Sequence, residues 1–347
     1  MFIALNGWRF IFALMIVWLH MPIWKPDNAD LGNPIVTFFF ILSGFLITIA
    51  YRDPLLNKTI TAKDFIIKRC ATIFPLQWLF TLLFVICSIN VVSYWAIPFH
   101  LTLTQSLIPL WEIDFTLNTP SWFLSSIFVC YLLTPPILGW LKNRNAIFIL
   151  YVIALLLWNL FLFSLPETIG RRWLCYISPF ARLFDYGNGI ILALYWPEIK
   201  KLFNQLLGAD KIRHTLLELW AIFLISISLF NIPILGLNRF LGIGSEVLNI
   251  FICVFISVYC LSDGFISKIL KYPIFNRLGD ISIAIYMCHT FVIHFTDSLL
   301  NKSLVLYLVV SIISIIIFSV ILDKYYCNHM KKSFINLCVK SKNCVVK

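Results

Sequence analysis

Residues 35–51 read IVTFFFILSGFLITIAY and contain no charged side chain. As an α-helix, these 17 residues would extend about 25 Å, close to the thickness of the hydrocarbon core of a bilayer. In lipid, the backbone N–H and C=O groups must be satisfied within the segment, and a helix does this. The stretch therefore predicts a membrane-spanning helix.

Similar apolar runs recur on both sides of this segment. Apolar residues make up 61% of the 347 residues and charged residues only 12%, and the mean hydropathy is +0.91. A soluble domain of this length needs more polar surface, so this composition indicates a membrane protein. The expected spans are 5–24, 35–51, 72–93, 121–141, 146–165, 180–197, 215–232, 244–262, 279–297 and 303–323. We predict an all-α, polytopic integral membrane protein with about ten transmembrane helices.

The positions of Lys and Arg predict the orientation of these helices. If the N-terminus is cytoplasmic, the segments on the cytoplasmic side hold 20 of the 27 Lys and Arg, and the segments outside hold five. Positive residues favour the cytoplasmic side of a membrane. Both termini are therefore predicted to be cytoplasmic.

No linker or repeat divides the chain, so we expect one transmembrane domain over 1–330 and a basic cytoplasmic tail over 331–347, held by anionic lipid. The first apolar run lacks a basic start and a small-residue cleavage site, so it is expected to be a permanent span. The net charge of +11 forms no basic stripe, and we expect no nucleic-acid partner. The ten Cys show no CxxC pair and no Cys/His spacing, so no metal is expected.

The first span, LNGWRFIFALMIVWLH, contains two ionisable side chains, Arg9 and His20. They are 11 positions apart in the sequence, which places both within about 20° on one helical face and about 16–17 Å apart along the axis. Ionisable groups inside a bilayer are costly and usually face a cavity, a partner or a substrate path. Arg9 would lie near the cytoplasmic end and His20 near the outer third.

Two interpretations of this pair stay open. Arg9 can extend to the cytoplasmic interface while His20 is a hydrogen-bonded interfacial histidine. Alternatively, His20 is a general base, since a histidine with an unperturbed pKa near 6.5 is mostly neutral at pH 7.

The same first span opens a series of six motifs in a fixed order. Its LNG is followed by Arg9 and His20 in an Arg-x10-His spacing. The other five segments are FFFILSGFLI with Ser43 and Gly44, FIIKRCATIFPLQW with Lys68, Arg69 and Pro75, PSWFLSSIFVCYLLTPPI with Trp122, Tyr131 and Pro135, SPFARLFDYGNGIILA with Pro179, Arg182, Asp185 and Gly189, and LGDISIAIYMCHTFVI with Ser282, Tyr286 and His289. Together they resemble acyltransferase family 3, whose members are bacterial membrane O-acyltransferases that modify cell-surface and exported glycans.

The resemblance implies an O-acetyltransferase of the bacterial inner membrane that uses acetyl-CoA to modify polysaccharide. The acceptor would be a glycan or a lipid-linked saccharide. Under this hypothesis, His20 and Arg9 are catalytic, with His20 taking the proton of the sugar hydroxyl. Arg9, Lys68 and Arg69 would bind the phosphates of the donor, since guanidinium groups pair bidentately with phosphate. The chain departs from the family at Ile127, where many members carry Glu, so a mechanism that needs this carboxylate does not transfer.

The remaining candidates for lining the site are Ser43, Trp122, Arg182, Asp185, Tyr286 and His289. Several of them have structural alternatives. Ser43 with Gly44 also fits close helix packing, and Arg182 with Asp185, three residues apart, also fits an ion pair. Trp122 fits an interfacial anchor as well as a glycan platform. In segment 94–120, Glu112 and Asp114 could contact sugar hydroxyls, but we expect them to be solvated loop acids.

Two other classes of protein remain as alternatives to the enzyme. A transporter or flippase of a glycan-export pathway explains the spans and the intramembrane charges, but it predicts repeated, broken helices, which the sequence does not show. A structural subunit of an export assembly gives no reason for Arg9 and His20 on one face. The oligomeric state is not predicted.

Overall fold

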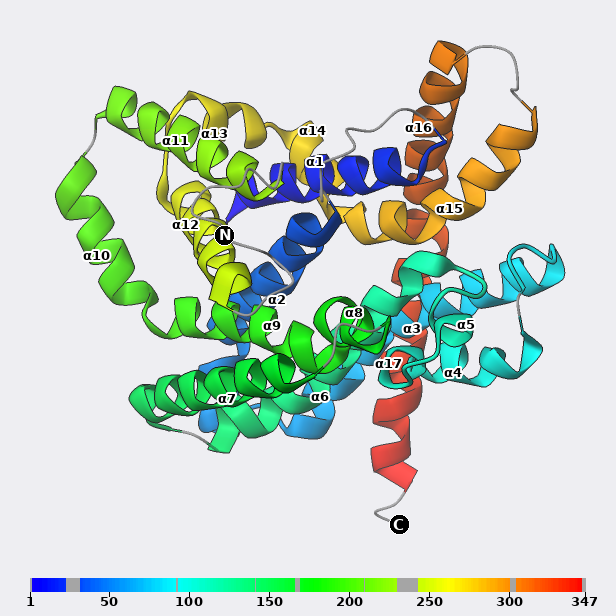
Figure 1. Cartoon of the computed structure of the whole chain (residues 1–347), viewed down its shortest axis with the longest axis horizontal. Helices are drawn as coiled ribbons and strands as arrows, with labels where there is room; N and C mark the ends of the chain where they lie inside the picture. Colours follow the sequence, from blue (N-terminus) through cyan, green and yellow to red (C-terminus); the bar gives the residue numbers. More distant parts are fainter. Residues whose placement is uncertain are drawn as a thin grey trace. The chain divides into compact units, whose positions relative to one another are not determined.

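The computed structural model of the chain is built from helices, with no strand among the residues that it describes (Figure 1). It describes all residues except 1, 23–31, 92, 141, 166–168, 209, 230–242, 300–303 and 345–347. The α-helices are α1 (Ile3–His20), α2 (Gly32–Leu56), α3 (Ala62–Ile86), α4 (Ile97–Thr102), α5 (Trp111–Asp114), α6 (Trp122–Trp140), α7 (Arg144–Ser164), α8 (Ile169–Tyr176), α9 (Pro179–Leu194), α10 (Trp196–Leu207), α11 (Lys211–Leu229), α12 (Ile243–Leu261), α13 (Phe265–Leu270), α14 (Pro273–Asp280), α15 (Ser282–Leu299), α16 (Leu304–Ile321) and α17 (Asn328–Cys344). The all-α class predicted from the sequence is confirmed.

Four shorter turns complete the described backbone. Three 3-10 turns lie between α3 and α6, namely η1 (Tyr94–Ala96), η2 (Gln105–Leu107) and η3 (Thr119–Ser121). A π-helical turn, η4 (Leu322–Cys327), joins α16 to α17. The stretch predicted as a basic tail is therefore helical up to Cys344, as part of α17.

Seven helical segments of the described chain are long and apolar enough to cross a bilayer. They are Ile3–His20, Gly32–Leu56, Ala62–Ile86, Thr119–Gly139, Arg144–Ser164, Lys211–Leu229 and Val305–Cys338. The helices α14 and α15 form an eighth candidate, bent by 63°. Each of the ten predicted spans contains a helix, but the count of ten and the orientation of the termini remain predictions.

The other three predicted spans differ from straight, full-length helices. The span expected over 279–297 is broken at Ile281, so its first two residues belong to α14. The helix α9 has only 16 residues, about 24 Å of helix, and contains the charged pair Arg182 and Asp185. In α12, the apolar helix covers Leu248–Leu261. Apolar content located these three segments, but it did not indicate the bounds of their helices or the bend at Ile281.

The chain divides into two compact units, which are described separately. The first unit comprises Met1–Phe12, Trp24–Asn57 and Pro136–Asp280. The second comprises Ala13–Ile23, Lys58–Pro135 and Ile281–Lys347. Arg9 thus belongs to the first unit and His20 to the second.

In the first unit, α2 and α9 pack backbone against backbone (Figure 1). A Cβ added to Gly44 would overlap the carbonyl oxygen of Tyr186, and one added to Gly189 would overlap that of Ile41. Small residues allow such close approach of membrane helices. The close-packing interpretation of Ser43–Gly44 therefore has a geometric basis in Gly44, while Ser43 is half-buried beside it.

In the second unit, α15 packs against α16 through polar contacts within an apolar surface. The Sγ of Cys288 lies 3.2 Å from the Oγ of Ser319, and the hydroxyls of Thr296 and Ser311 lie 2.8 Å apart. The hydroxyl of Tyr326 in η4 donates to the carbonyl of Pro75 in α3 (2.9 Å). This contact joins η4 to the middle of α3.

The segment between α3 and α6 buries polar side chains. His100, Gln105 and Asp114 are all fully buried, whereas Glu112 is exposed. The expectation that Asp114 is a solvated loop acid was therefore wrong. The packing of α4, α5 and the 3-10 turns against each other encloses it, which no local sequence pattern indicates.

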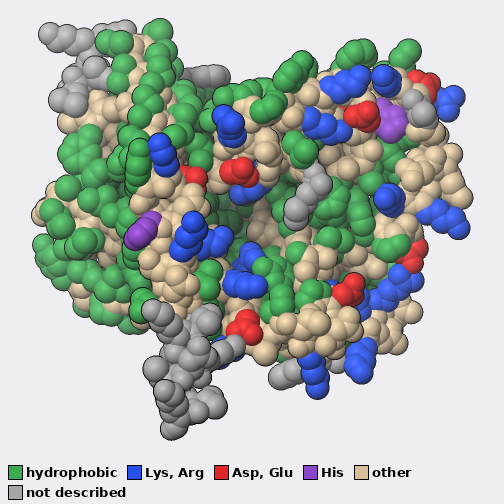
Figure 2. All heavy atoms as spheres, turned by 180° about the vertical axis from the view of Figure 1, so that it is seen from behind, with side chains coloured by type: hydrophobic (Ala, Val, Ile, Leu, Met, Phe, Trp, Pro, Cys, Tyr) green, Lys and Arg blue, Asp and Glu red, His purple; other side chains and the backbone are tan. Residues whose placement is uncertain are grey.

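Apolar side chains cover broad areas of the face shown in Figure 2. On α7, Leu156, Leu157, Leu160 and Phe163 are 56%, 62%, 66% and 62% exposed. A helix of an aqueous protein would bury such residues, so the surface of α7 fits contact with lipid. This agrees with a multi-pass membrane protein.

Candidate active site

His20 is the last residue of α1, where its ring is fixed by the helix itself. The Nδ1 atom lies 2.9 Å from the carbonyl oxygen of Ile16. Since a carbonyl only accepts, Nδ1 carries the hydrogen, and the lone pair of a neutral ring is then on Nε2. A neutral ring in this tautomer can accept a proton at Nε2.

A second histidine from the far end of the sequence lies beside His20. The ring centroids of His20 and His289 are 4.8 Å apart with an interplanar angle of 66°. His289 is fully buried, and its Nδ1 donates to the carbonyl of Tyr286 at 2.6 Å. Its Nε2 has no hydrogen-bond partner among the described residues. Both histidines were predicted site residues, and the structure brings them together.

The segment before α6 holds the part of α15 that carries His289. The amide nitrogen of Asn118 donates to the carbonyl of Met287 (3.0 Å), and its oxygen accepts from the hydroxyl of Thr290 (2.7 Å). The hydroxyl of Tyr286 donates to the carbonyl of Pro120 (3.0 Å). Sequence reasoning missed Asn118 and Thr290. The only available signal was the Asn-Thr-Pro that precedes a helix start.

In the first unit, Arg9 is held by a polar cluster at the start of α1. Its Nη1 donates to the Oδ1 of Asn6 (3.1 Å). The Nδ2 of Asn6 donates in turn to the Oδ1 of Asn276 (2.7 Å) and to the Oδ1 of Asp280 (3.3 Å). A permanent cation is therefore fixed at this end of α1.

The two other predicted donor-binding cations lie on α3 in the second unit. The guanidinium carbon of Arg69 is 5.6 Å from the ring centroid of Phe65 and 6.0 Å from that of Tyr131. These distances fit cation–π contacts, which orient a guanidinium group. Lys68 is half-buried, and its carbonyl accepts from the hydroxyl of Thr72 (3.0 Å).

Arg182 and Asp185 form a buried ion pair, and both side chains also make hydrogen bonds to neighbouring helices. The Nη1 of Arg182 lies 2.7 Å from the Oδ2 of Asp185, and Nη2 donates to the Oδ1 of Asn33 (3.0 Å). Thr37 donates to the same carboxylate oxygen (3.2 Å), and Asn249 donates to the other (2.9 Å). Charges satisfied in this way fit the structural alternative, in which the pair joins α2, α9 and α12.

The last two positions lie on α6. Trp122 is its first residue and is only 5% exposed. Ile127, where many family members carry Glu, is also buried. Contact of Trp122, or of the other candidate site-lining residues, with a substrate remains a prediction. Among the described residues, no group of His, Cys, Asp and Glu side chains is arranged to hold a metal ion.

A family model of acyltransferase 3, described as an acyltransferase domain, matches residues 2–324 and so covers nearly the whole chain. No curated protein and no solved structure matches the chain.

Proposed function

The chain belongs to the acyltransferase 3 family, and we propose that it transfers an acetyl group from acetyl-CoA to a hydroxyl of a cell-surface or exported glycan. The family match supports an acyl-transferring membrane enzyme. The donor, the acceptor and the base are the parts that we add. The observation that carries the proposal is the hydrogen bond from His20 to Ile16, since it leaves Nε2 as the proton acceptor.

The proposed reaction is a direct transfer. The sugar oxygen attacks the thioester carbonyl carbon while its proton passes to the Nε2 of His20. The tetrahedral intermediate then collapses, the C–S bond breaks, and the departing thiolate takes the proton from the imidazolium. General-base assistance of this kind contributes typically about 10²–10⁴-fold to the rate.

Arg9, Lys68 and Arg69 supply the cations proposed to bind the phosphates of the donor. Arginine presents a planar fork of donors that matches phosphate oxygens, whereas lysine acts as a point charge. The hydrogen bond of Arg9 to Asn6 and the aromatic neighbours of Arg69 support this role, because both restrict the orientation of a guanidinium group.

We place the enzyme in the bacterial inner membrane, where cytoplasmic acetyl-CoA and a glycan or lipid-linked saccharide are both within reach. The apolar, exposed surface of helices such as α7 supports a lipid environment. The acetyl group and the glycan acceptor are what the resemblance to acyltransferase family 3 implies, and the assay below tests both.

The test is purified protein incubated with acetyl-labelled acetyl-CoA and glycan from the native host. We expect the label to move to the glycan with release of free CoA. Uptake of labelled solute into vesicles without CoA release would instead establish the transporter.

Two variants separate the roles of the residues in this assay. His20→Ala is expected to lose at least about 10²-fold in transfer rate while still binding CoA. His294→Ala is the matched control, because His294 is an exposed histidine on α15 and is expected to transfer at the wild-type rate. Undiminished transfer by His20→Ala would rule out His20 as the base.

A further inference from the structure

Two sequence motifs that lie far apart in the chain meet at the start of α1. The motif LNG covers residues 5–7, and the motif LGD covers residues 278–280. Asn6 from the first motif donates to Asp280 from the second (3.3 Å) and to Asn276 one turn earlier on α14 (2.7 Å). The function proposed above uses Asn6 only as the hydrogen-bond partner of Arg9, and it does not use Asp280.

The glycines of both motifs allow this contact. A Cβ added to Gly279 would overlap the backbone carbonyl of Asn6, so α14 lies directly against the first turn of α1. A Cβ added to Gly7 would lie 2.8 Å from the Cδ2 of Leu270, at the end of α13. The first turns of α1 are therefore held on one side by α13 and α14.

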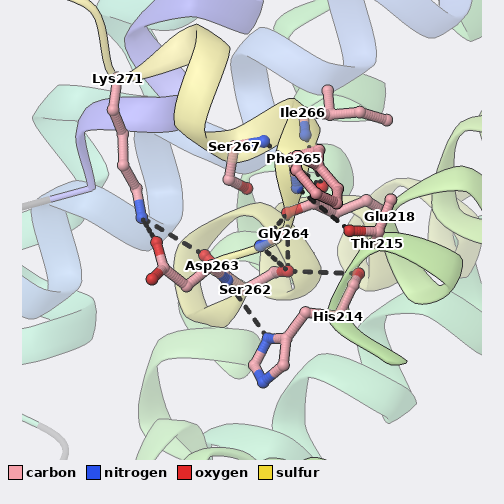
Figure 3. A network of polar contacts seen from close by, with 10 residues as sticks. All are labelled: His214, Thr215, Glu218, Ser262, Asp263, Gly264, Phe265, Ile266, Ser267 and Lys271. Carbon is pink, nitrogen blue, oxygen red and sulfur yellow. Dashed lines mark hydrogen bonds and ion pairs between the residues drawn. The ribbon is translucent and has the colours of Figure 1, made fainter. Parts of the chain in front are cut away.

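The start of α13 is itself anchored by a buried carboxylate, Glu218 of α11 (Figure 3). Its Oε1 accepts from the hydroxyl of Ser262 (2.7 Å) and the amide of Gly264 (2.9 Å). Its Oε2 accepts from the amide of Ile266 (3.0 Å). A longer hydrogen bond comes from the amide of Ser267 (3.4 Å). The carboxylate of Glu218 thus accepts four hydrogen bonds, and these hold the start of α13 in place.

The side chain of Asn6 is suited to join these helices to Arg9. An amide carries both an acceptor and two donors. Its Oδ1 accepts from the guanidinium of Arg9 (3.1 Å), and its Nδ2 points to the carboxylate of Asp280. Neither an apolar side chain nor a carboxylate can make both contacts beside Asp280.

We propose that Asn6 is a positioning residue, fixed by Asp280, that orients the guanidinium of Arg9 toward the phosphates of the acyl donor. This inference rests on the proposed function. It adds that the donor's phosphates are bound by an arginine whose direction is set by the contact between the LNG and LGD motifs.

The test compares two acyl donors, acetyl-CoA and S-acetylpantetheine, which carries the same thioester without phosphates. Asn6→Ala is expected to raise the KM for acetyl-CoA at least tenfold and to leave kcat/KM for S-acetylpantetheine within about twofold of wild type. General damage to the fold would lower both.

A double-mutant cycle with Arg9→Ala provides the second measurement. If Asn6 acts through Arg9, Asn6→Ala has no further effect on the KM for acetyl-CoA once Arg9 is removed. Additive effects of the two substitutions would overturn the inference, and so would an equal loss with both donors or a wild-type KM for Asn6→Ala.

A milder variant covers the case in which Asn6→Ala does not fold. Asp280→Asn keeps the shape of the side chain and removes its charge. We therefore expect the KM for acetyl-CoA to rise selectively, but by a smaller factor than in Asn6→Ala. If wild type uses acetyl-CoA but Asp280→Asn and Asn6→Ala both behave like wild type, only this inference fails. If wild type uses neither donor, the proposed function fails with it.

Discussion

At the scale of single residues, His20 and His289 are arranged alike. Each donates its Nδ1 hydrogen to a backbone carbonyl of the preceding turn, to Ile16 and to Tyr286 respectively. In both neutral rings the lone pair is then on Nε2. The two rings also lie side by side, so two proton acceptors are close together at the end of α1.

The contacts of Asn118 give a prediction for the support of this pair. Asn118→Ala removes the hydrogen bonds to Met287 and Thr290 and leaves a buried carbonyl without its partner. We expect a loss of about 1–3 kcal/mol in the free energy of unfolding and a lower transfer rate, measured by thermal unfolding in detergent and by the transfer assay.

Thr290→Val removes only one of the two hydrogen bonds that Asn118→Ala removes. It removes only the hydroxyl that donates to Asn118 and keeps the shape of the side chain, so its effects should be smaller. A wild-type unfolding temperature for Asn118→Ala would contradict the role of this contact.

His100 gives a pH-dependent prediction. Burial lowers the pKa of His100 to about 4 from its ordinary value of 6.5. Between these values the unfolded chain binds a proton that the folded chain does not, so the contribution of His100 lowers stability as the pH falls from about 6.5 to 4. The shift corresponds to a loss of up to roughly 3 kcal/mol.

Thermal unfolding at pH 7.5 and at pH 5 checks this prediction. His100→Gln can still donate to the carbonyl of Ile113, which accepts from the Nε2 of His100 in the wild type (2.8 Å). We expect this variant to lose less stability than wild type between the two pH values. An identical loss in both proteins would exclude His100 as the cause.

The sequence indicated a functional role for some of these residues but not for others. Arg9 and His20 were recognisable because charged or titratable side chains are rare inside an apolar span. Asn6 and Asn118 were not recognisable as partners, because the groups that they bind lie about 170 to 270 positions away and local patterns do not encode such contacts.

At the scale of helices, the close approach of α2 and α9 gives the clearest prediction. In Gly44→Ala, the new methyl group would overlap the carbonyl of Tyr186, so the helices must separate. We expect a large fall in the amount of folded protein and in its unfolding temperature. Size-exclusion chromatography and thermal unfolding in detergent measure both.

Gly139→Ala on α6 is the matched control. A Cβ at Gly139 would lie 3.8 Å from the Cβ of Leu55, which is an ordinary contact. This variant should fold like wild type. If Gly44→Ala is equally well tolerated, the backbone contact between α2 and α9 is not as close as described.

The helices themselves were largely predictable, since apolar runs and turn residues determine them locally. The start of α3 was missed, because the expected span began at residue 72 and α3 begins at Ala62. Its local signal is Thr61, whose hydroxyl accepts from the amide of Asp64 (3.1 Å) as an N-cap. The break at Ile281 was not predictable. The sequence LGDIS around it is compatible with a continuous helix, and the bend coincides with the packing of α14 on Asn6.

At the scale of the whole molecule, the distribution of Lys and Arg predicts that both termini are cytoplasmic. Reporter domains that are active on only one side of the membrane, fused to each terminus of the full chain, test this. We expect both fusions to report the cytoplasm. Reporters on opposite sides would require an odd number of spans and contradict the ten-span topology.

We propose that this acyltransferase 3 family protein acylates a glycan with His20 as the base. The most direct measurement compares the O-acetyl content of surface glycans, by mass spectrometry, in a deletion strain of the native host that expresses wild type, His20→Ala or His294→Ala at equal membrane levels. We predict that wild type and His294→Ala restore the O-acetyl groups and that His20→Ala does not. Full restoration by His20→Ala would show that His20 is not the base.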